Sequence, residues 1–313
     1  MQISNAGPSR ATFRKKASQR GTVARVLTLA IMTGTLGVFG LVGTPSSAIA
    51  FDPNSTFKAD DKPQTILRYG FDALQRGDMA GALGAFRFGA QRNDLAAQWK
   101  LARMFQVGEG VHKDPVTAFE LFDKIADRYA DRAPEGRDRA FVSHALVSLG
   151  RYHRKGIKQS KLPSNPRLAE FYFYQAAALY HDAAAQYELG RLYQSDLLGQ
   201  SQPRLAARWY GLAARKGHSG AQGRLGEMLF YGQGVRRNPV KGLVYLSKAT
   251  AKRTRKGIRK FRRMRRQAFN DASQAQRAAA NKMLQRLGLL DTANEQTGKN
   301  AFAFQEIPKV LED

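Results

Sequence analysis

Residues 206–239 read AARWYGLAARKGHSGAQGRLGEMLFYGQGVRRNP, and this stretch holds the pattern that decides the fold. From Ala206 onward, alanines and large side chains recur at offsets of 0, 3, 4, 7 and 8, the spacing of one stripe along an amphipathic helix. From Ala221 onward, apolar residues recur at offsets of 0, 4 and 7, which is again helical spacing. The stretch therefore predicts two helices joined by a short turn.

Both patterns recur along the chain, and they alternate. Copies of the first pattern begin at Ala82, Ala118, Ala169, Ala206 and Gly242, at intervals of 36, 51, 37 and 36 residues. Copies of the second pattern begin at Ala97, Ala145, Ala185 and Ala221. In each of the second copies a small residue follows the leucine, which predicts close approach of a neighbouring helix. The long interval indicates an insertion around residues 127–138.

The turns between these patterns carry recognisable end signals. The Gly-x-Gly sequences at 108–110 and 232–234 predict helix ends with left-handed backbone. Three helices are expected to begin with a capping side chain followed by proline, at Asp114-Pro115, Asn165-Pro166 and Asn238-Pro239. Gln202-Pro203 keeps the proline but has a weaker cap. Residues 154–157 and 195–200 lack the glycine pair, so these turns are expected to be remodelled.

Together these residues carry a family resemblance. The order A-Q-x-x-L-G, G-x-G-V, D/N-P and A-x-x-W-Y-x-x-A-A resembles the Sel1-like repeat, a relative of the tetratricopeptide repeat, over about residues 65–250. The resemblance implies an all-α fold, a right-handed α-solenoid of helix pairs over residues 64–250 with a concave face for ligands. Residues 251–290 are expected to form a basic helical segment, and residues 291–313 a flexible tail.

The first fifty residues predict export. Six basic residues and no acidic one occupy residues 1–25, an uncharged apolar run follows over 26–42, and Ala48-Ile49-Ala50 ends the segment. This is the layout of a secretory signal peptide over 1–50, with cleavage expected after Ala50 and a short linker over 51–63. An uncleaved membrane anchor is the alternative, but a run of 17 residues is short for a span. The predicted location is the periplasm.

Charge and cysteine content narrow the classes of partner. The chain has 51 basic and 25 acidic residues, and removal of residues 1–50 leaves 45 basic residues against 25 acidic ones. Such an excess of positive charge favours polyanions as binding partners. An exported protein rarely meets nucleic acid. The expected partners are therefore anionic lipid, anionic polysaccharide or an acidic protein face. There is no cysteine, which excludes disulfides and thiol chemistry.

No pattern of catalytic or metal-binding residues stands out. The five histidines are His112, His144, His153, His181 and His218, and no two are three or four residues apart. No nucleophile elbow, phosphate-binding loop or dinucleotide fingerprint occurs, and the carboxylates are scattered. The sequence therefore predicts a binding protein rather than an enzyme, with no metal site and no cofactor.

Three aromatic residues are candidates for partner binding. Trp99 lies off the apolar stripe of its predicted helix, so it is a candidate for the concave surface. Phe171 and Tyr174 flank the stripe residues Tyr172 and Phe173, and one or both would line a binding face. Packing between helices is the alternative for this aromatic run.

A basic block near the C-terminus is the candidate for anionic surfaces. Its cations are Lys252, Arg253, Arg255, Lys256, Arg259, Lys260, Arg262, Arg263, Arg265 and Arg266. One interpretation is a solvated helix end; the other is electrostatic docking to lipid headgroups, acidic glycan or an acidic partner. Ile258, Phe261 and Met264 form an apolar edge that would equally cap the solenoid.

The complete layout also resembles one group of Sel1-like proteins, the periplasmic exopolysaccharide regulators of α-proteobacteria. The resemblance rests on the exported start, the repeats, the lack of cysteine, Phe51-Asp52, and residues 97–104 and 143–157. It implies a negative regulator that binds the sensor domain of a two-component histidine kinase and represses exopolysaccharide synthesis, with a periplasmic protease for its turnover. The alternative is an envelope scaffold that docks on glycan or lipid through its basic block.

Overall fold

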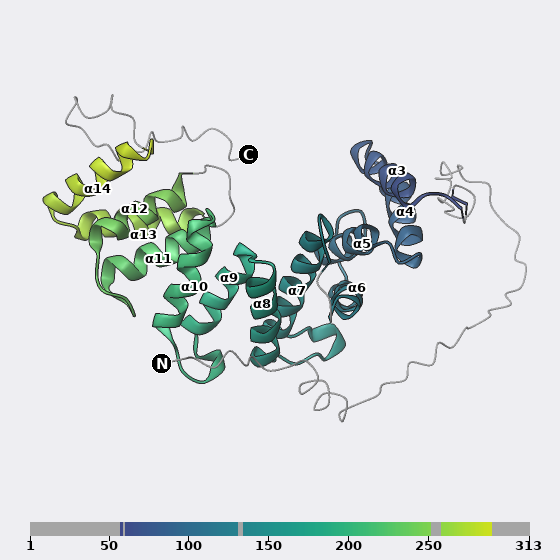
Figure 1. Cartoon of the computed structure of the whole chain (residues 1–313), viewed down its shortest axis with the longest axis horizontal. Helices are drawn as coiled ribbons and strands as arrows, with labels where there is room; N and C mark the ends of the chain where they lie inside the picture. Colours follow the sequence, from purple (N-terminus) through teal and green to yellow (C-terminus); the bar gives the residue numbers. More distant parts are fainter. Residues whose placement is uncertain (1–56, 59, 131–133, 252–257, 290–313) are drawn as a thin grey trace, which may run out of the picture. The chain divides into compact units, whose positions relative to one another are not determined.

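The computed structural model describes residues 57–58, 60–130, 134–251 and 258–289, which contain twelve α-helices and no strand (Figure 1). The segment expected to be a signal peptide, most of the predicted linker and the predicted tail lie outside these residues. Within them, no helix is both long and apolar enough to cross a membrane. The chain divides into two compact units, residues 1–85 and 86–313, and each is described by itself.

The first unit contains α3 (Pro63–Gln75) and the beginning of α4 (Met79–Gln91). Pro63 stands in the first turn of α3, where the missing N–H of proline costs no hydrogen bond. Asp78 begins the next helix, because its carboxylate accepts a hydrogen bond from the Gly81 N–H at 2.8 Å. In the described part of this unit, the rings of Phe57 and Tyr69 meet edge to face at 5.2 Å.

The second unit is a succession of paired helices. These are α5 (Leu95–Val107), α6 (Pro115–Arg128), α7 (Asp138–Lys155), α8 (Pro166–Leu179), α9 (Ala183–Gln194), α10 (Pro203–Arg215), α11 (Ser219–Tyr231) and α12 (Pro239–Thr250), followed by α13 (Ile258–Asp271) and α14 (Gln274–Arg286). Each helix from α5 to α12 packs against the next, and Figure 1 shows the members of each pair side by side. The predicted all-α repeat fold is confirmed.

The small residue after each leucine allows this packing. A Cβ atom added at Gly150 of α7 would lie 2.5 Å from the ring of Phe173 on α8. The same atom at Gly190 of α9 would lie 2.5 Å from the ring of Tyr210 on α10. Both rings are fully buried second anchors of the first pattern. The two sequence patterns therefore interlock, since the small residue of one helix receives the large residue of the next.

The glutamine that follows the alanine also has a structural role. The amide nitrogen of Gln98 donates to the Ala90 carbonyl at 3.2 Å, and that of Gln222 donates to the Ala214 carbonyl at 3.2 Å. Both glutamines are buried. Each is a second donor to a carbonyl at the end of the preceding helix, which also accepts a turn bond from the N–H of Asn93 or Gly217. The Ala-Gln pair is thus a tie between successive helices.

The predicted helix ends are confirmed. Gly108 and Gly232 adopt positive φ angles of 82° and 78° directly after their helices. The side chains of Asp114, Asn165 and Asn238 accept hydrogen bonds from N–H groups in the first turn of α6, α8 and α12, whereas Gln202 makes no such bond. Three helices of the second pattern, α5, α9 and α11, also begin at capping residues. The sequence patterns did not identify these caps, which are Asp94, Asp182 and His218.

The 51-residue interval arises from more than the expected insertion at 127–138. Helix α7 has 18 residues whereas its counterpart α9 has 12, so part of the additional sequence lengthens a helix. Residues 131–133 of the connection lie outside the described residues. The turn after α7 is remodelled as predicted, with a short 3-10 helix over Lys158–Ser160 and a bridge between Ile157 and Leu162.

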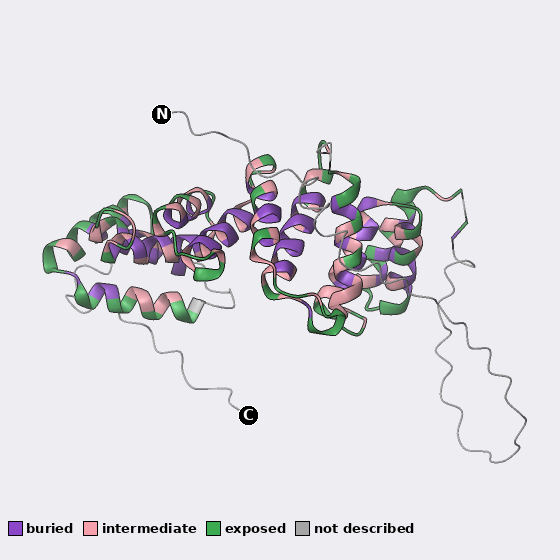
Figure 2. Cartoon of the chain, turned by 90° about the horizontal axis from the view of Figure 1, so that it is seen from below, coloured by how far each residue is buried: buried purple, intermediate pink, exposed green. Residues whose placement is uncertain are grey.

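The buried side chains of the second unit form two clusters along the facing sides of the helices (Figure 2). The larger one extends from α5 to α11, and the smaller one joins the end of α11 and α12 to α13 and α14. Phe261 of α13 packs on Gly223 of α11, where a Cβ would meet its ring at 2.1 Å. Met264 packs against the smaller cluster. The apolar edge of the basic segment therefore covers the end of the helix stack.

Candidate functional site

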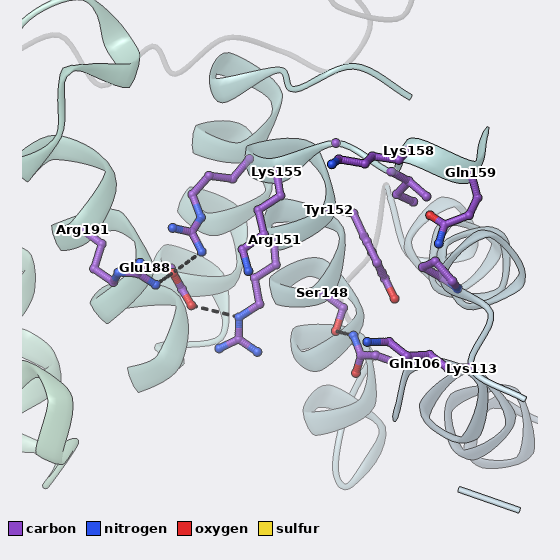
Figure 3. A pocket seen from close by; sticks show the side chains of 14 residues that line it. Gln106, Lys113, Ser148, Arg151, Tyr152, Lys155, Lys158, Gln159, Glu188 and Arg191 are labelled. Carbon is purple, nitrogen blue, oxygen red and sulfur yellow. Dashed lines mark hydrogen bonds and ion pairs between the residues drawn. The ribbon is translucent and has the colours of Figure 1, made fainter. Parts of the chain in front are cut away.

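The second unit contains a polar cavity of about 630 Å³ between the ends of α5, α7 and α9. The turn after α5 supplies Lys113, and the remodelled turn after α7 supplies Lys158 and Gln159. Figure 3 shows Ser148 and Tyr152 of α7 facing Gln106 of α5 across one side. We call this the cationic cavity, because its lining contains six cations and a single carboxylate.

The cations of the cationic cavity come from four segments of the chain. They are Lys113, Arg151, Arg154, Lys155, Lys158 and Arg191. The carboxylate is Glu188. Lys113, Lys155 and Lys158 are exposed, and among the described residues no ion pair joins any of them to a carboxylate. The lining therefore has a large positive surplus, as an anion site requires.

Glu188 is the centre of an ion-pair cluster that joins α7 to α9. Its carboxylate lies 2.9 Å from Nε of Arg151, 3.5 Å from Nη2 of Arg154 and 3.2 Å from Nη1 of Arg191. The Glu188 side chain is only 5% exposed. A buried carboxylate is stable when its oxygens are paired in this way, and in return it orients three guanidiniums. The cluster thus builds a rigid arginine wall (Figure 3).

Arg154 is the least exposed of these three arginines. Burial lowers the pKa of its guanidinium, while the carboxylate of Glu188 acts in the opposite direction. Its Nε atom is buried and has no hydrogen-bond partner among the described residues. One guanidinium of the wall therefore keeps unused donor capacity.

The polar side of the cationic cavity is held in place by a cross-helix hydrogen bond. The amide nitrogen of Gln106 donates to the hydroxyl of Ser148 at 3.3 Å, and Ser148 is fully buried. Tyr152 packs edge to face on Phe119 at 6.0 Å, and burial raises the pKa of its hydroxyl. The lining contains no histidine, and Glu188 is fully engaged with arginines. The arrangement suits binding of an anion rather than proton transfer.

The departure of this turn from the repeat pattern places Lys155, Lys158 and Gln159 at the cationic cavity. Gly156 has a positive φ of 73°, and a Cβ there would lie 2.6 Å from the Leu162 carbonyl, so only glycine fits. The turn then closes through the bridge between Ile157 and Leu162. The remodelled turn, expected from the missing glycine pair, therefore carries part of the candidate site.

The predicted anchor Trp99 is half-buried between α5 and α7. Its ring lies 5.0 Å from Phe141 and meets His144 edge to face at 5.5 Å. Its Nε1 atom is buried without a partner among the described residues. Helix α7 packs against α5 on this side, and partner binding through the half-buried Trp99 stays a prediction.

Phe171 and Tyr174 differ in exposure. Phe171 is 8% exposed and packs edge to face on Tyr172 at 5.5 Å, so it is a packing residue and the expectation that it lines a binding face is corrected. Tyr174 is 41% exposed, and its ring meets Trp209 of α10 edge to face at 6.1 Å. Partner binding through Tyr174 stays a prediction.

The basic block is described only in part. Lys252, Arg253, Arg255 and Lys256 lie outside the described residues. On α13, the side chains of Arg259, Lys260, Arg263 and Arg266 are exposed. Arg262 and Arg265 are half-buried, and burial lowers the pKa of Arg265. The described part thus has an apolar face that packs and a basic face toward solvent, and docking of that basic face to an anionic surface stays a prediction.

Three of the histidines, His144, His153 and His218, serve in packing or capping. His153 stacks on Tyr172 at 5.4 Å with parallel rings, and Nδ1 of His218 accepts from the Ala221 N–H at 3.1 Å. Burial lowers the pKa of both His144 and His153 to about 4, so both rings are neutral at pH 7. Within the part of the chain that the structure describes, no cluster of three or more His, Asp or Glu side chains forms.

Comparison with known proteins places this geometry in a family. The Sel1 repeat family model matches residues 95–128, 143–181, 183–218 and 219–252, which correspond to the pairs α5–α6, α7–α8, α9–α10 and α11–α12. A solved Sel1 repeat protein from Oxalobacter formigenes superposes with a TM-score of 0.53 at 19% identity, covering 65% of this chain and 75% of its own. That likeness supports the fold alone.

Two curated relatives have the same printed name, exopolysaccharide production negative regulator. The protein of Rhizobium meliloti (strain 1021) is 30% identical over 264 residues, which are 84% of this chain and 95% of the relative. The protein of Rhizobium leguminosarum bv. viciae is 29% identical over 232 residues, which are 74% of this chain and 84% of the relative. The chain therefore belongs to the family of Sel1-repeat proteins that includes the exopolysaccharide production negative regulators.

Proposed function

We propose that this protein is an exported negative regulator of exopolysaccharide production that acts by binding the sensor domain of a two-component histidine kinase. The observation that carries the proposal is the match to the Rhizobium meliloti regulator, which spans 84% of this chain and 95% of the relative. A match of that extent covers the whole repeat stack rather than one shared motif. Repeat stacks of this kind present extended surfaces to other proteins.

The proposed location is the periplasm. Support comes from the basic, apolar and small-residue segments within residues 1–50, which form the layout of a cleavable signal. The mass of the protein isolated from cells tests this step. A chain that begins at Phe51 is expected, and a full-length chain retained in the membrane would contradict cleavage after Ala50.

The proposed mechanism is thermodynamic linkage between binding and kinase activity. A repressor shifts the kinase toward its inactive state only if it binds that state more tightly than the active one. A shift from 1:99 to 99:1 needs a difference in affinity of about 10⁴-fold, or about 5.5 kcal/mol. Proteolysis of the repressor by a periplasmic protease would remove this bias and release the kinase.

The exposed Tyr174, with the half-buried Trp209 beside it, is the proposed contact surface on the described residues. Aromatic side chains that are partly exposed and held by a neighbouring ring are frequent anchors of protein interfaces. Tyr174→Ala is expected to weaken repression while leaving the fold intact, because the side chain is 41% exposed. Leu197→Ala is the matched control, because Leu197 is 48% exposed and lies in the short 3-10 helix Asp196–Leu198 after α9.

Deletion of the gene tests the regulatory function. Expression of exopolysaccharide genes should rise in the deletion strain, and a second deletion of the kinase should abolish the rise. Unchanged expression would refute negative regulation. A rise that persists without the kinase would refute the kinase as partner while leaving regulation intact.

A second function has support from α13, whose basic face is exposed at Arg259, Lys260, Arg263 and Arg266. We propose docking to an anionic envelope surface as the alternative, since each cation near such a surface contributes about 1 kcal/mol. Neutralising these four residues separates the two functions. Loss of co-sedimentation with anionic vesicles, with repression unchanged, would assign α13 to docking.

A further inference from the structure

The cationic cavity has an excess of positive charge that the described side chains do not neutralise. Three guanidiniums share the single carboxylate of Glu188, and three exposed lysines at its rim have no carboxylate partner in the described residues. Like charges held this close repel one another, so their clustering disfavours the empty site. An anionic ligand would relieve that repulsion.

The arrangement of the cations indicates a ligand with more than one negative group. The arginine wall is formed by α7 and α9, whereas Lys113 and Lys158 come from two different turns. A single small anion would contact one of these groups and leave the others unpaired. A ligand with anionic groups spaced along its length would contact the wall and the rim together.

The remaining lining indicates a sugar-like framework between the anionic groups. Gln106 and Gln159 supply amides and Tyr152 supplies an aromatic ring, all beside the cations. Amides donate to and accept from hydroxyl groups, and an aromatic ring packs against the C–H face of a sugar. The cavity volume of about 630 Å³ falls within the range of small-ligand pockets, about 300–1,000 Å³, rather than that of a flat protein interface.

We propose that the cationic cavity binds a short carboxylate-bearing oligosaccharide. The arginine wall receives one carboxylate, the rim lysines receive the next, and hydroxyl groups bind to the exposed Gln159 amide and to the second N–H of Gln106, whose first N–H donates to Ser148. The inference goes beyond the proposed regulatory function and does not depend on it, since it concerns a ligand of the repeat stack rather than a protein partner.

Calorimetry with the purified protein tests the proposal directly. The probes are an oligogalacturonate, a neutral malto-oligosaccharide of the same length and an oligoglutamate peptide of the same charge. We expect saturable binding of the oligogalacturonate that weakens as salt rises, no binding of the neutral sugar, and at least tenfold weaker binding of the peptide. Absence of oligogalacturonate binding would overturn the proposal. Equal or tighter binding of the peptide would replace it with an acidic-peptide site.

Two sets of variants separate this site from diffuse attraction to a basic protein. Lys155→Ala with Lys158→Ala removes two exposed cations of the rim, and the expected result is at least a tenfold loss of affinity. Arg277→Ala with Lys282→Ala removes two exposed cations of α14, which contributes nothing to the cavity, and should leave affinity unchanged. Equal losses in both pairs would overturn a local site.

Gln159→Ala distinguishes sugar recognition from charge alone. The Gln159 side chain is exposed, and the substitution changes no charge, so the fold should be retained. We expect several-fold weaker binding of the oligogalacturonate and unchanged binding of the peptide. Unchanged affinity for both would remove the sugar-specific part of the proposal. Thermal unfolding of each variant establishes that the fold is intact.

Discussion

The turn after α5 and the turn after α7 connect equivalent helices with different residues. In both, the N–H of the capping residue donates back to the preceding helix: Asp114 to the Phe105 carbonyl at 2.9 Å, and Asn165 to the His153 carbonyl at 2.6 Å. Between these anchors the first turn uses the pair Gly108 and Gly110, and the second uses a 3-10 helix and a bridge.

The comparison of the two turns shows that the anchor hydrogen bond recurs whereas the sequence between the anchors varies. The same backbone bond recurs in the later turns, where Gln202 donates to the Tyr193 carbonyl at 2.7 Å and Asn238 to the Leu229 carbonyl at 2.7 Å. All four carbonyls stand eight positions after the alanine of the second pattern. The anchor bond thus defines the repeat, whereas the residues between the anchors vary and, after α7, supply part of the cationic cavity.

The largest expected difference concerns the ion pairs beside the two turns, that of Glu188 with the end of α7 and that of Glu109 with α5. Glu188→Ala leaves Arg154 without its buried carboxylate, and the free energy of unfolding should fall by about 3 kcal/mol. Glu109→Ala in the turn after α5 removes an ion pair with Lys100 at 2.9 Å, but Glu109 is 42% exposed, so the loss should be about 0.5 kcal/mol. Denaturant unfolding of both variants measures this. Equal losses would mean that the Glu188 cluster has no structural role.

The anchor carbonyls of the two turns belong to Phe105 and His153. Because only histidine titrates, we expect the two regions to respond differently to acid. His153 has a pKa of about 4 in the folded chain, lowered by burial from an ordinary value near 6.5. The unfolded chain therefore binds the proton first, and stability falls as pH drops from about 6.5 to about 4. His153→Phe, which copies Phe105, should lessen the loss between pH 7 and pH 5 by about 2 kcal/mol. Part of the remaining loss comes from His144, whose pKa is also about 4.

Thermal unfolding across this pH range tests the assignment. The variant should lose less stability than the original chain on acidification, since phenylalanine does not titrate and keeps the ring against Tyr172. Parallel pH profiles for the two proteins would show that His153 does not contribute.

The small residue after the leucine also differs between these regions, being Ala102 in α5 and Gly150 in α7. Gly150→Ala would place a Cβ 2.5 Å from the ring of Phe173, and we expect a loss of about 1.5 kcal/mol. Gly211→Ala in α10 is the matched control, because its nearest neighbour is 4.0 Å away. The higher helix propensity of alanine should stabilise that variant by up to about 1 kcal/mol. Loss of stability in both variants would contradict the steric explanation.

The smallest effects are expected at the caps. Asp114→Ala and Asn165→Ala each remove a hydrogen bond to the first turn of a helix, and each should cost about 1 kcal/mol. Gln202 makes no cap bond, so Gln202→Asp should raise stability by up to about 1 kcal/mol, while Gln202→Ala should have little effect. No gain from Gln202→Asp would show that the cap side chain is unimportant in this repeat.

The helices and their ends could be predicted from the sequence because they depend on local signals. The apolar spacing, the glycines after α5 and α11 and the Asn-Pro or Asp-Pro starts act within a few residues of one another. The caps at Asp94, Asp182 and His218 were missed, although each precedes the second pattern by three residues and a regular cap position was available as a signal.

The cationic cavity could not be predicted, because it depends on the register between helices. Arg151 and Glu188 are separated by 37 residues, and only the packing of α7 on α9 brings their side chains to 2.9 Å. The same cause explains Trp99 and Phe171. In a repeat stack each helix is covered by its own partner and by the next pair, so a residue beside the apolar stripe is still partly or fully buried.

Crosslinking in living cells tests the central claim most directly. The protein is crosslinked in place, isolated, and its captured partner identified by mass spectrometry. The account predicts the extracytoplasmic sensor domain of a histidine kinase, captured less by the Tyr174→Ala variant than by the Leu197→Ala control. Capture of envelope glycan or lipid without any kinase, in cells where exopolysaccharide genes are repressed, would contradict it.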